Sequence, residues 1–105
     1  MGAEMKLYKL TEWQSPTGRW HAANVEDLAG TSNAWWLVPR ILGLSYTDYI
    51  LLLKNKYHAG HFKFIDYGEF SKRNSLLLFD FEKHEDCHGF ITSVNKISRN
   101  KNVMV

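Results

Sequence analysis

The feature that most constrains this fold is the stretch of residues 31–57, which predicts two helices meeting at Gly43. In its second half, aromatic and aliphatic residues recur at helical spacing, at Tyr46, Tyr49, Ile50, Leu53 and Tyr57. Such a stripe is typical of an amphipathic helix. Ser45 can accept a hydrogen bond from the backbone N–H of Asp48, whose carboxylate lies at the positive end of the helix dipole. Because glycine readily adopts the left-handed conformation that ends many helices, Gly43 is the predicted corner of a helical hairpin.

The helix before Gly43 is expected to begin near Ala34, after three consecutive N-cap candidates, Thr31, Ser32 and Asn33. Pro39 complicates this prediction, because proline inside a helix removes one backbone hydrogen bond and clashes with the carbonyl four residues earlier. Either Pro39 kinks the helix, or residues 35–38 are extended and Pro39 is the first helical residue. We favour the helix that begins near Ala34.

Two β-hairpins are predicted on either side of the helix pair. Residues 5–13 and 19–24 are expected to be strands, joined by turn residues that include Pro16 and Gly18. Residues 61–67 and 76–82 form a second predicted strand pair, joined by a polar, basic loop. Phe62 and Phe64 are expected to share one face, and Leu77, Phe79 and Phe81 to point inward, with Asp80 and Glu82 pointing outward.

A last helix is expected to begin at Glu85 or Asp86. Its inward stripe is Cys87, Phe90, Ile91, Val94 and Ile97, and its outward residues include Asn95, Lys96 and Arg99. Residues 100–105 are expected to form a frayed tail. The sequence therefore predicts one α+β domain spanning residues 1–105, of order ββααββα. In this fold an antiparallel sheet from two hairpins packs against a central helical hairpin and a C-terminal helix.

Composition narrows the functional class. The formal net charge of +2 is too small to dictate a polyanionic partner, and it argues against an acidic surface that mimics DNA. The single cysteine, Cys87, excludes an intramolecular disulfide and fits a reducing compartment. No apolar run approaches the roughly 20 residues of a membrane span, and the N-terminus lacks a signal-peptide pattern. We therefore expect a cytoplasmic protein without a membrane partner.

A helix-turn-helix is the first specific alternative, because residues 40–45 (RILGLS) are similar to the Leu-Gly-x-Ser corner of bacterial helix-turn-helix proteins. The second helix would then enter the major groove of DNA. The apolar run of residues 50–53 and the acidic Asp48 both oppose this role, since an acid in the N-terminal turn repels phosphate. A core helical hairpin is favoured. If nucleic acid is bound, the expected contacts are Lys54, Lys56 and Lys101.

Histidine and cysteine spacing raises the question of a zinc site. His58 and His61 are one pair with two intervening residues, and His84 and Cys87 are another, with His88 beside it. Two short pairs are typical of structural zinc sites, but thiolates usually dominate such sites and only one is present. Cys87 also begins the inward apolar stripe, where a free cysteine acts as a small hydrophobic residue. We predict no metal and no other cofactor.

Catalysis is not predicted. Cys87 and His88 are neighbours on a helix, so their side chains point about 100° apart and do not form a nucleophile–base pair. No glycine-rich loop is present to hold phosphate. The carboxylates on strands and loops, Asp66, Glu69, Asp80 and Glu82, are expected to be solvated.

Basic and aromatic residues suggest a binding surface instead. Lys72 and Arg73 lie in the second hairpin loop, and Lys96 and Arg99 lie on the last helix. They form one patch if the loop folds toward that helix. Exposed tryptophans among Trp13, Trp20 and Trp36 could anchor a partner, because tryptophan and arginine dominate binding hot spots. The predicted partner-binding residues are Trp20, Lys72, Arg73, Lys96 and Arg99.

Residues 35–45 (WWLVPRILGLS), the following DYI-x₂-L segment, the Phe-rich hairpin and residues 95–102 (NKISRNKN) together resemble small uncharacterised proteins of phages and mobile elements in low-GC Gram-positive bacteria. Compact phage proteins of this size often bind and block a host machine, and anti-CRISPR inhibitors are among them. The resemblance therefore implies a stoichiometric inhibitor of a host nucleic-acid-targeting protein or ribonucleoprotein, such as a Cas nuclease. The alternative is a small helix-turn-helix-like regulator that binds DNA or RNA. The sequence does not fix the oligomeric state, and a dimer is one of the alternatives.

Overall fold

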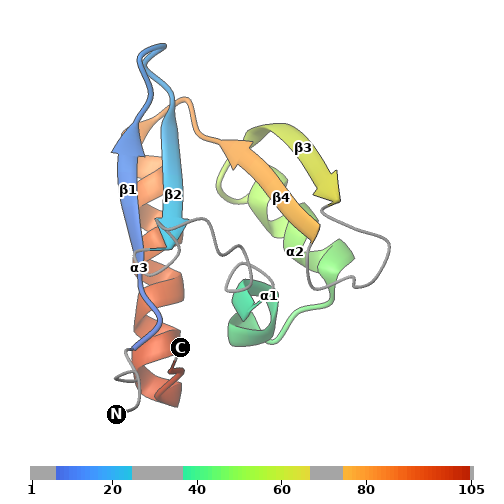
Figure 1. Ribbon diagram of the computed structural model, residues 1–105, viewed down its shortest axis with the longest axis vertical. Coiled ribbons are helices and arrows are strands. Elements are labelled where there is room, and N and C mark those ends of the chain that lie inside the picture. Colours follow the sequence, from blue (N-terminus) through green and yellow to red (C-terminus); the bar gives the residue numbers. More distant parts are fainter. Residues whose placement is uncertain (1–6, 25–36, 67–74, 105) are drawn as a thin grey trace.

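The computed structural model describes residues 7–24, 37–66 and 75–104. Its elements follow the predicted order: β1 (Leu10–Gln14), β2 (Trp20–Asn24), α1 (Leu37–Leu42), α2 (Tyr46–Asn55), β3 (Gly60–Asp66), β4 (Ser75–Asp80) and α3 (His84–Lys101). The α+β fold class is thus confirmed. Figure 1 shows the β1–β2 hairpin lying along α3, with α1, α2 and the β3–β4 hairpin on the other side of the molecule. The predictions for Trp36, Lys72 and Arg73, and for the N-caps before α1, fall outside the described residues.

The corner at Gly43 has the predicted geometry. Its φ is +70°, and an added Cβ would meet no atom within 4 Å, so the backbone conformation rather than space calls for glycine here. The N–H of Asp48 donates to Ser45 Oγ at 3.2 Å, which caps α2 as expected. Pro39 is helical and buried within the described part of α1, and where this helix begins lies outside the described residues.

Among the described residues, one isolated backbone bridge joins the two hairpins. Trp20 of β2 and Phe81, just after β4, exchange two backbone hydrogen bonds of 2.8 Å, which form this isolated β-bridge between the hairpins. The described strands therefore form two antiparallel two-stranded sheets. An irregularity between Gly60 and Lys63, with His61 at a φ of +53°, disturbs β3 close to the bridge. Such bulges bend a strand and increase its local twist.

The core forms around one aromatic side chain of α3, Phe90. Its ring centre lies 5.5 to 6.4 Å from the ring centres of Tyr49, Tyr57, Phe79 and Phe81. The predicted inward stripe of α3 is buried from Cys87 to Val94, with Ile97 partly buried. Leu77, Phe79 and Phe81 point inward as predicted. Within the described parts of the chain, no helix is both long enough and apolar enough to cross a membrane.

The prediction that Asn95 faces solvent is wrong. Its Oδ1 accepts a hydrogen bond from the N–H of Leu10 at 2.8 Å, and its Nδ2 donates to the carbonyl of Leu10 at 3.0 Å. One turn on, Ser98 Oγ donates to the carbonyl of Tyr8 at 2.8 Å. These polar side chains point inward because they satisfy backbone groups of the N-terminal strand, which would otherwise be left unpaired where α3 covers them.

The prediction of a frayed C-terminal tail is also wrong. The helix continues to Lys101 and ends at Asn102, whose φ of +52° is left-handed. Beyond it, the N–H of Tyr8 donates to the carbonyl of Val103 at 2.7 Å, and Leu7 forms a bridge with Met104. Residues near the two ends of the chain therefore pair with each other. The first predicted strand correspondingly begins later, at Leu10.

Candidate functional site

The described members of the predicted partner face lie toward the two ends of α3. Trp20 is half-buried at the bridge between the hairpins, and its ring centre lies 4.3 Å from that of His84, the first residue of the helix. Lys96 and Arg99 are exposed near the other end. Lys96 is 12 residues beyond His84, which corresponds to about 18 Å along a helix. Trp20 therefore packs where the two hairpins meet the start of α3. Lys96 and Arg99 lie well apart from it.

The lysines of the nucleic-acid alternative lie in different surroundings. Lys54 and Lys56 are exposed at the C-terminal end of α2, where the Lys54 Nζ lies 5.1 Å from the ring centre of Phe62. A recognition helix reads base edges with its N-terminal residues, so these lysines are at the opposite end. Lys101 Nζ donates to the carbonyl of Ile41 at 2.9 Å, which ties α3 to the end of α1.

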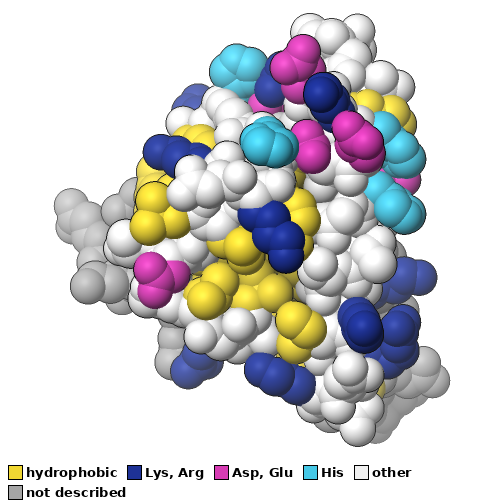
Figure 2. All heavy atoms as spheres, turned by 180° about the vertical axis from the view of Figure 1, so that it is seen from behind, with side chains coloured by type: hydrophobic (Ala, Val, Ile, Leu, Met, Phe, Trp, Pro, Cys, Tyr) yellow, Lys and Arg dark blue, Asp and Glu magenta, His cyan; other side chains and the backbone are white. Residues whose placement is uncertain are grey.

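Aromatic side chains reach the surface between α2 and β3. Phe62 packs on the core residue Phe79 with ring centres 6.0 Å apart, whereas Phe64, two residues on, is 55% exposed. Phe64 contacts Tyr46 edge to face at 5.7 Å, and Tyr46 is itself 38% exposed. We call Tyr46, Phe62 and Phe64 the aromatic surface. Figure 2 shows that hydrophobic side chains also reach the surface in the middle of the rear face, with lysine and arginine side chains around them.

A shallow groove of about 160 Å³ opens where the two hairpins diverge from their bridge. It is lined by Trp13, His21, Ala22, Ala23, Leu77, Leu78 and Phe79. The exposed Trp13 ring stacks on His21, with ring centres 4.4 Å apart and planes 13° from parallel. The stack is held within the first hairpin, because these two residues face each other in the β1–β2 register.

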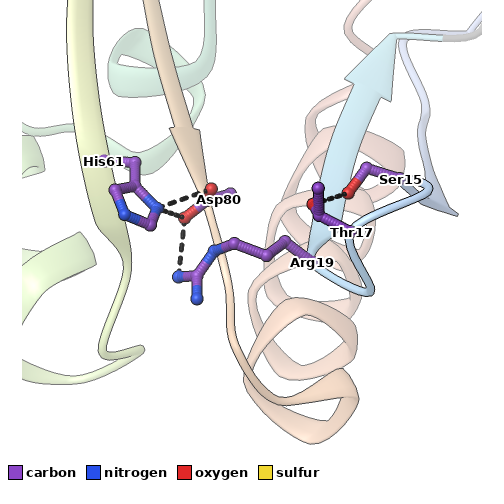
Figure 3. Close-up of polar contacts among 5 residues, drawn as sticks. All are labelled: Ser15, Thr17, Arg19, His61 and Asp80. Carbon is purple, nitrogen blue, oxygen red and sulfur yellow. Dashed lines mark hydrogen bonds and ion pairs between the residues drawn. The ribbon is translucent and has the colours of Figure 1, made fainter.

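The carboxylate of Asp80 corrects another prediction, because it is buried rather than solvated. Figure 3 shows it between Arg19 of the first hairpin and His61 of β3. Arg19 Nη2 lies 2.8 Å from Oδ1, and His61 Nδ1 lies 3.0 Å from Oδ1 and 2.9 Å from Oδ2. As strand alternation predicts, Asp80 points to the face opposite that of Phe79. The side chains of Arg19 and His61 cover it on that face, so Asp80 is only 7% exposed.

The electrostatics of this group follow from its contacts. Burial alone would raise the pKa of Asp80, but hydrogen bonds from Arg19 and His61 and their charges outweigh burial and lower it. The hydrogen bond with Asp80 likewise raises the pKa of Arg19. The Asp80 carboxylate therefore helps to hold the two hairpins together.

In the turn beside Arg19, Ser15 Oγ and Thr17 Oγ1 share a 2.8 Å hydrogen bond. Of the other carboxylates, Glu82 is exposed as predicted, whereas the Asp66 side chain and Glu69 are outside the described part of the chain.

The four residues considered for zinc do not form one cluster. Cys87 is fully buried, and burial, followed by the charge of Glu12, raises the pKa of its thiol to about 12. His61 is held by Asp80. Within the described residues, the one group of at least three histidine, cysteine or acidic side chains with metal-like spacing is different: Glu12, His84 and His88.

The Glu12–His84–His88 cluster joins β1 to the first turns of α3. Glu12 Oε1 lies 2.7 Å from His84 Nε2, and Glu12 Oε2 lies 3.7 Å from His88 Nδ1. The three potential ligand atoms all lie within 4.8 Å of one another. His84 lies just before the predicted start of this helix at Glu85 or Asp86, and because α3 begins at His84 the two histidines are one helical turn apart. Glu12 carried no local signal, because it is 72 residues away from His84 in the sequence.

Comparisons of the chain with protein-family models, with curated proteins and with solved structures found no match.

Proposed function

We propose that this chain is a non-catalytic binding protein that attaches to a partner protein through the aromatic surface of Tyr46, Phe62 and Phe64. The observation that carries the proposal is the placement of Phe64, which is 55% exposed yet held against Tyr46. Aromatic rings bury a large area and have few rotatable bonds, so a ring already fixed in place loses little entropy on binding. Such rings dominate the centres of protein interfaces.

Two further observations support a binding role over catalysis. The only thiol is buried in the core, where its raised pKa of about 12 keeps it protonated and unreactive. The buried carboxylate of Asp80 already accepts hydrogen bonds from two side chains and has a lowered pKa, which does not suit a general acid or base near neutral pH. Both groups are used to hold the fold together.

We further propose that the partner is a bacterial nucleic-acid-targeting machine and that binding inhibits it stoichiometrically, as anti-CRISPR proteins do. The support for this partner class is the resemblance of residues 35–45 and 95–102 to phage and mobile-element proteins. Lys54, which lies over the Phe62 ring beside the aromatic surface, adds a cation at its rim and would suit an acidic or nucleic-acid-bearing partner.

The test compares two variants of the same hairpin. Phe64→Ser removes the exposed ring, and Leu78→Ser changes a residue that is 40% exposed but lies on the other face of the hairpin, opposite Lys63 in the register. Each protein is used for affinity purification from nuclease-treated bacterial lysate, with quantitative mass spectrometry. We expect one partner to be recovered equally by the unaltered chain and the Leu78 variant and to be lost with Phe64→Ser. Equal recovery by both variants would refute the aromatic surface, and loss of the partner on nuclease treatment would refute direct protein contact.

A second candidate is a small DNA- or RNA-binding regulator, which the exposure of Lys54 and Lys56 at the end of α2 favours. This function predicts an affinity that falls steeply with salt. Fluorescence anisotropy with labelled duplex and single strands at low salt would show binding that weakens in a Lys54→Gln, Lys56→Gln double variant. Absence of binding to either nucleic acid at low salt would exclude it.

A further inference from the structure

We propose that Glu12, His84 and His88 form a binding site for a divalent transition metal, with Zn²⁺ as the ion that best fits the ligand set. This inference is independent of the proposed function, and it revises the expectation from sequence that the chain binds no metal. Two imidazoles and one carboxylate are a common set of three protein ligands for zinc, with the remaining position open to water or another ligand.

The helix supplies the first part of the site. His84 and His88 are separated by four residues in α3, so they lie on the same face one turn apart, and their ring centres are 5.6 Å apart. This spacing is the one by which a single helix presents two imidazoles to one zinc ion. The rings are 49% and 65% exposed, so an ion can reach them from solvent.

The strand supplies the third ligand. Tetrahedral zinc with bonds of about 2.1 Å places its ligand atoms about 3.4 Å apart. The observed separations of 2.7 Å, between Glu12 Oε1 and His84 Nε2, and 3.7 Å, between Glu12 Oε2 and His88 Nδ1, lie on either side of this value. All three ligand atoms lie within 4.8 Å of one another, so small side-chain rotations would bring them to the separations that zinc requires.

One oxygen of the carboxylate is an independent indication. Glu12 Oε2 is shielded from solvent and accepts no hydrogen bond from the described residues, while its partner oxygen, Oε1, is bound to His84. A buried carboxylate oxygen without a donor costs free energy, which an ion beside it would recover. The oxygen lies on the side of Glu12 that faces His88.

The surroundings hold the ligands in place. The Trp20 ring packs against His84 with ring centres 4.3 Å apart, which restricts that imidazole. Trp20 is itself fixed by its backbone bridge to Phe81. Immobilised neighbours of this kind orient metal ligands and increase affinity. The site would therefore link the first hairpin to the start of α3.

The test uses the full, untagged chain, because a polyhistidine tag would bind the same ions. After treatment with EDTA and dialysis, the chain is titrated with ZnCl₂ by isothermal calorimetry. We expect one Zn²⁺ per chain and a rise in melting temperature on zinc addition. His88→Gln and Glu12→Gln should each weaken binding at least about tenfold and abolish the melting-temperature rise. His58→Gln, which changes an exposed histidine outside the cluster, should leave both unchanged.

The contrast between the variants decides the question. His88→Gln leaves the shorter contact of 2.7 Å between Glu12 and His84 intact, so a loss of zinc affinity in this variant would come from the loss of the His88 ligand. Circular dichroism of each variant without metal confirms that it is folded. Zinc affinity equal in His88→Gln and the unaltered chain would overturn the proposal. An equal loss of affinity in His58→Gln would overturn it as well, because the ion would then be bound elsewhere.

Discussion

Polar side chains of α3 hold the first hairpin in addition to its buried Leu10 and Ala22, whereas the second hairpin is held mainly by aromatic packing. Asn95 and Ser98 of α3 hydrogen-bond to the backbone of Leu10 and Tyr8, at the edge of β1. Phe79 and Phe81, in and just after β4, instead pack their rings on Phe90. Hydrogen bonds require particular atoms at particular places, while ring packing mainly requires burial of area. The first hairpin should therefore be sensitive to single polar changes and the second to loss of volume.

The largest effect is expected in the aromatic region. Phe90→Ala removes a fully buried ring that contacts four others, and it should lower the free energy of unfolding by about 4 kcal/mol, from lost burial and the cavity left behind. Urea denaturation followed by circular dichroism measures this. A loss below about 1 kcal/mol would show that this aromatic cluster is not the centre of the core.

The next effect separates the two hairpins. Asn95→Ala leaves the N–H and carbonyl of Leu10 without their partner, which should cost about 2 kcal/mol. Amide hydrogen exchange should speed up in β1 and β2 and change little in β3 and β4. Lys96→Ala is the matched control, because Lys96 is the next residue on α3 and its side chain is exposed. Equal acceleration in both hairpins would contradict the difference between them.

Asp80 is where the two regions meet, since it binds Arg19 from one hairpin and His61 from the other. Asp80→Asn should cost about 1.5 kcal/mol at neutral pH through lost charge-assisted hydrogen bonds. The pKa of Asp80 is lowered from 3.8, so its contribution is present above that value and is lost as pH falls through the lower folded-state pKa.

The corresponding measurement is urea denaturation of both proteins at pH 7 and near pH 2. The difference in unfolding free energy between Asp80→Asn and the unaltered chain should be largest at neutral pH and shrink in acid. A difference that stayed constant across this range would show that the ionised carboxylate is not what joins the hairpins.

The smallest effect concerns the corner between the helices. Gly43→Ala should cost about 1 kcal/mol, because alanine resists a φ of +70° although the added methyl group meets no atom. Gly43→Asn should recover part of this loss, since asparagine tolerates the left-handed region. Thermal denaturation of the two variants would rank them, and an alanine variant as stable as the glycine form would contradict the role of the corner.

The aromatic region was predictable from the sequence because its signals are local. The cap at Ser45, the corner at Gly43 and the stripe through Phe90 each depend on residues a few positions apart, and all three are confirmed. Alternation also predicted that Phe79 points inward. Hydrophobic periodicity reports which side of an element is buried, and it does so without knowledge of the partner.

The polar contacts were not predictable in the same way. Asn95, Asp80 and Glu12 were expected to be solvated or had no assigned role, because polarity alone favours the surface. Their partners lie 85, 61 and 72 residues away in the sequence, and no local pattern connects them. The histidine pair of α3 had the right helical spacing, but only the docking of β1 on α3 brings a carboxylate to it.

The most direct test of the proposed function is the affinity of the recovered partner for chains that differ at Phe64 and at Leu78, measured by isothermal calorimetry with purified proteins. The partner should bind the unaltered chain and the Leu78→Ser variant with the same affinity, and the Phe64→Ser variant at least about tenfold more weakly, the factor that 1.4 kcal/mol represents. Equal affinity for all three chains would contradict the assignment of the aromatic surface as the binding site.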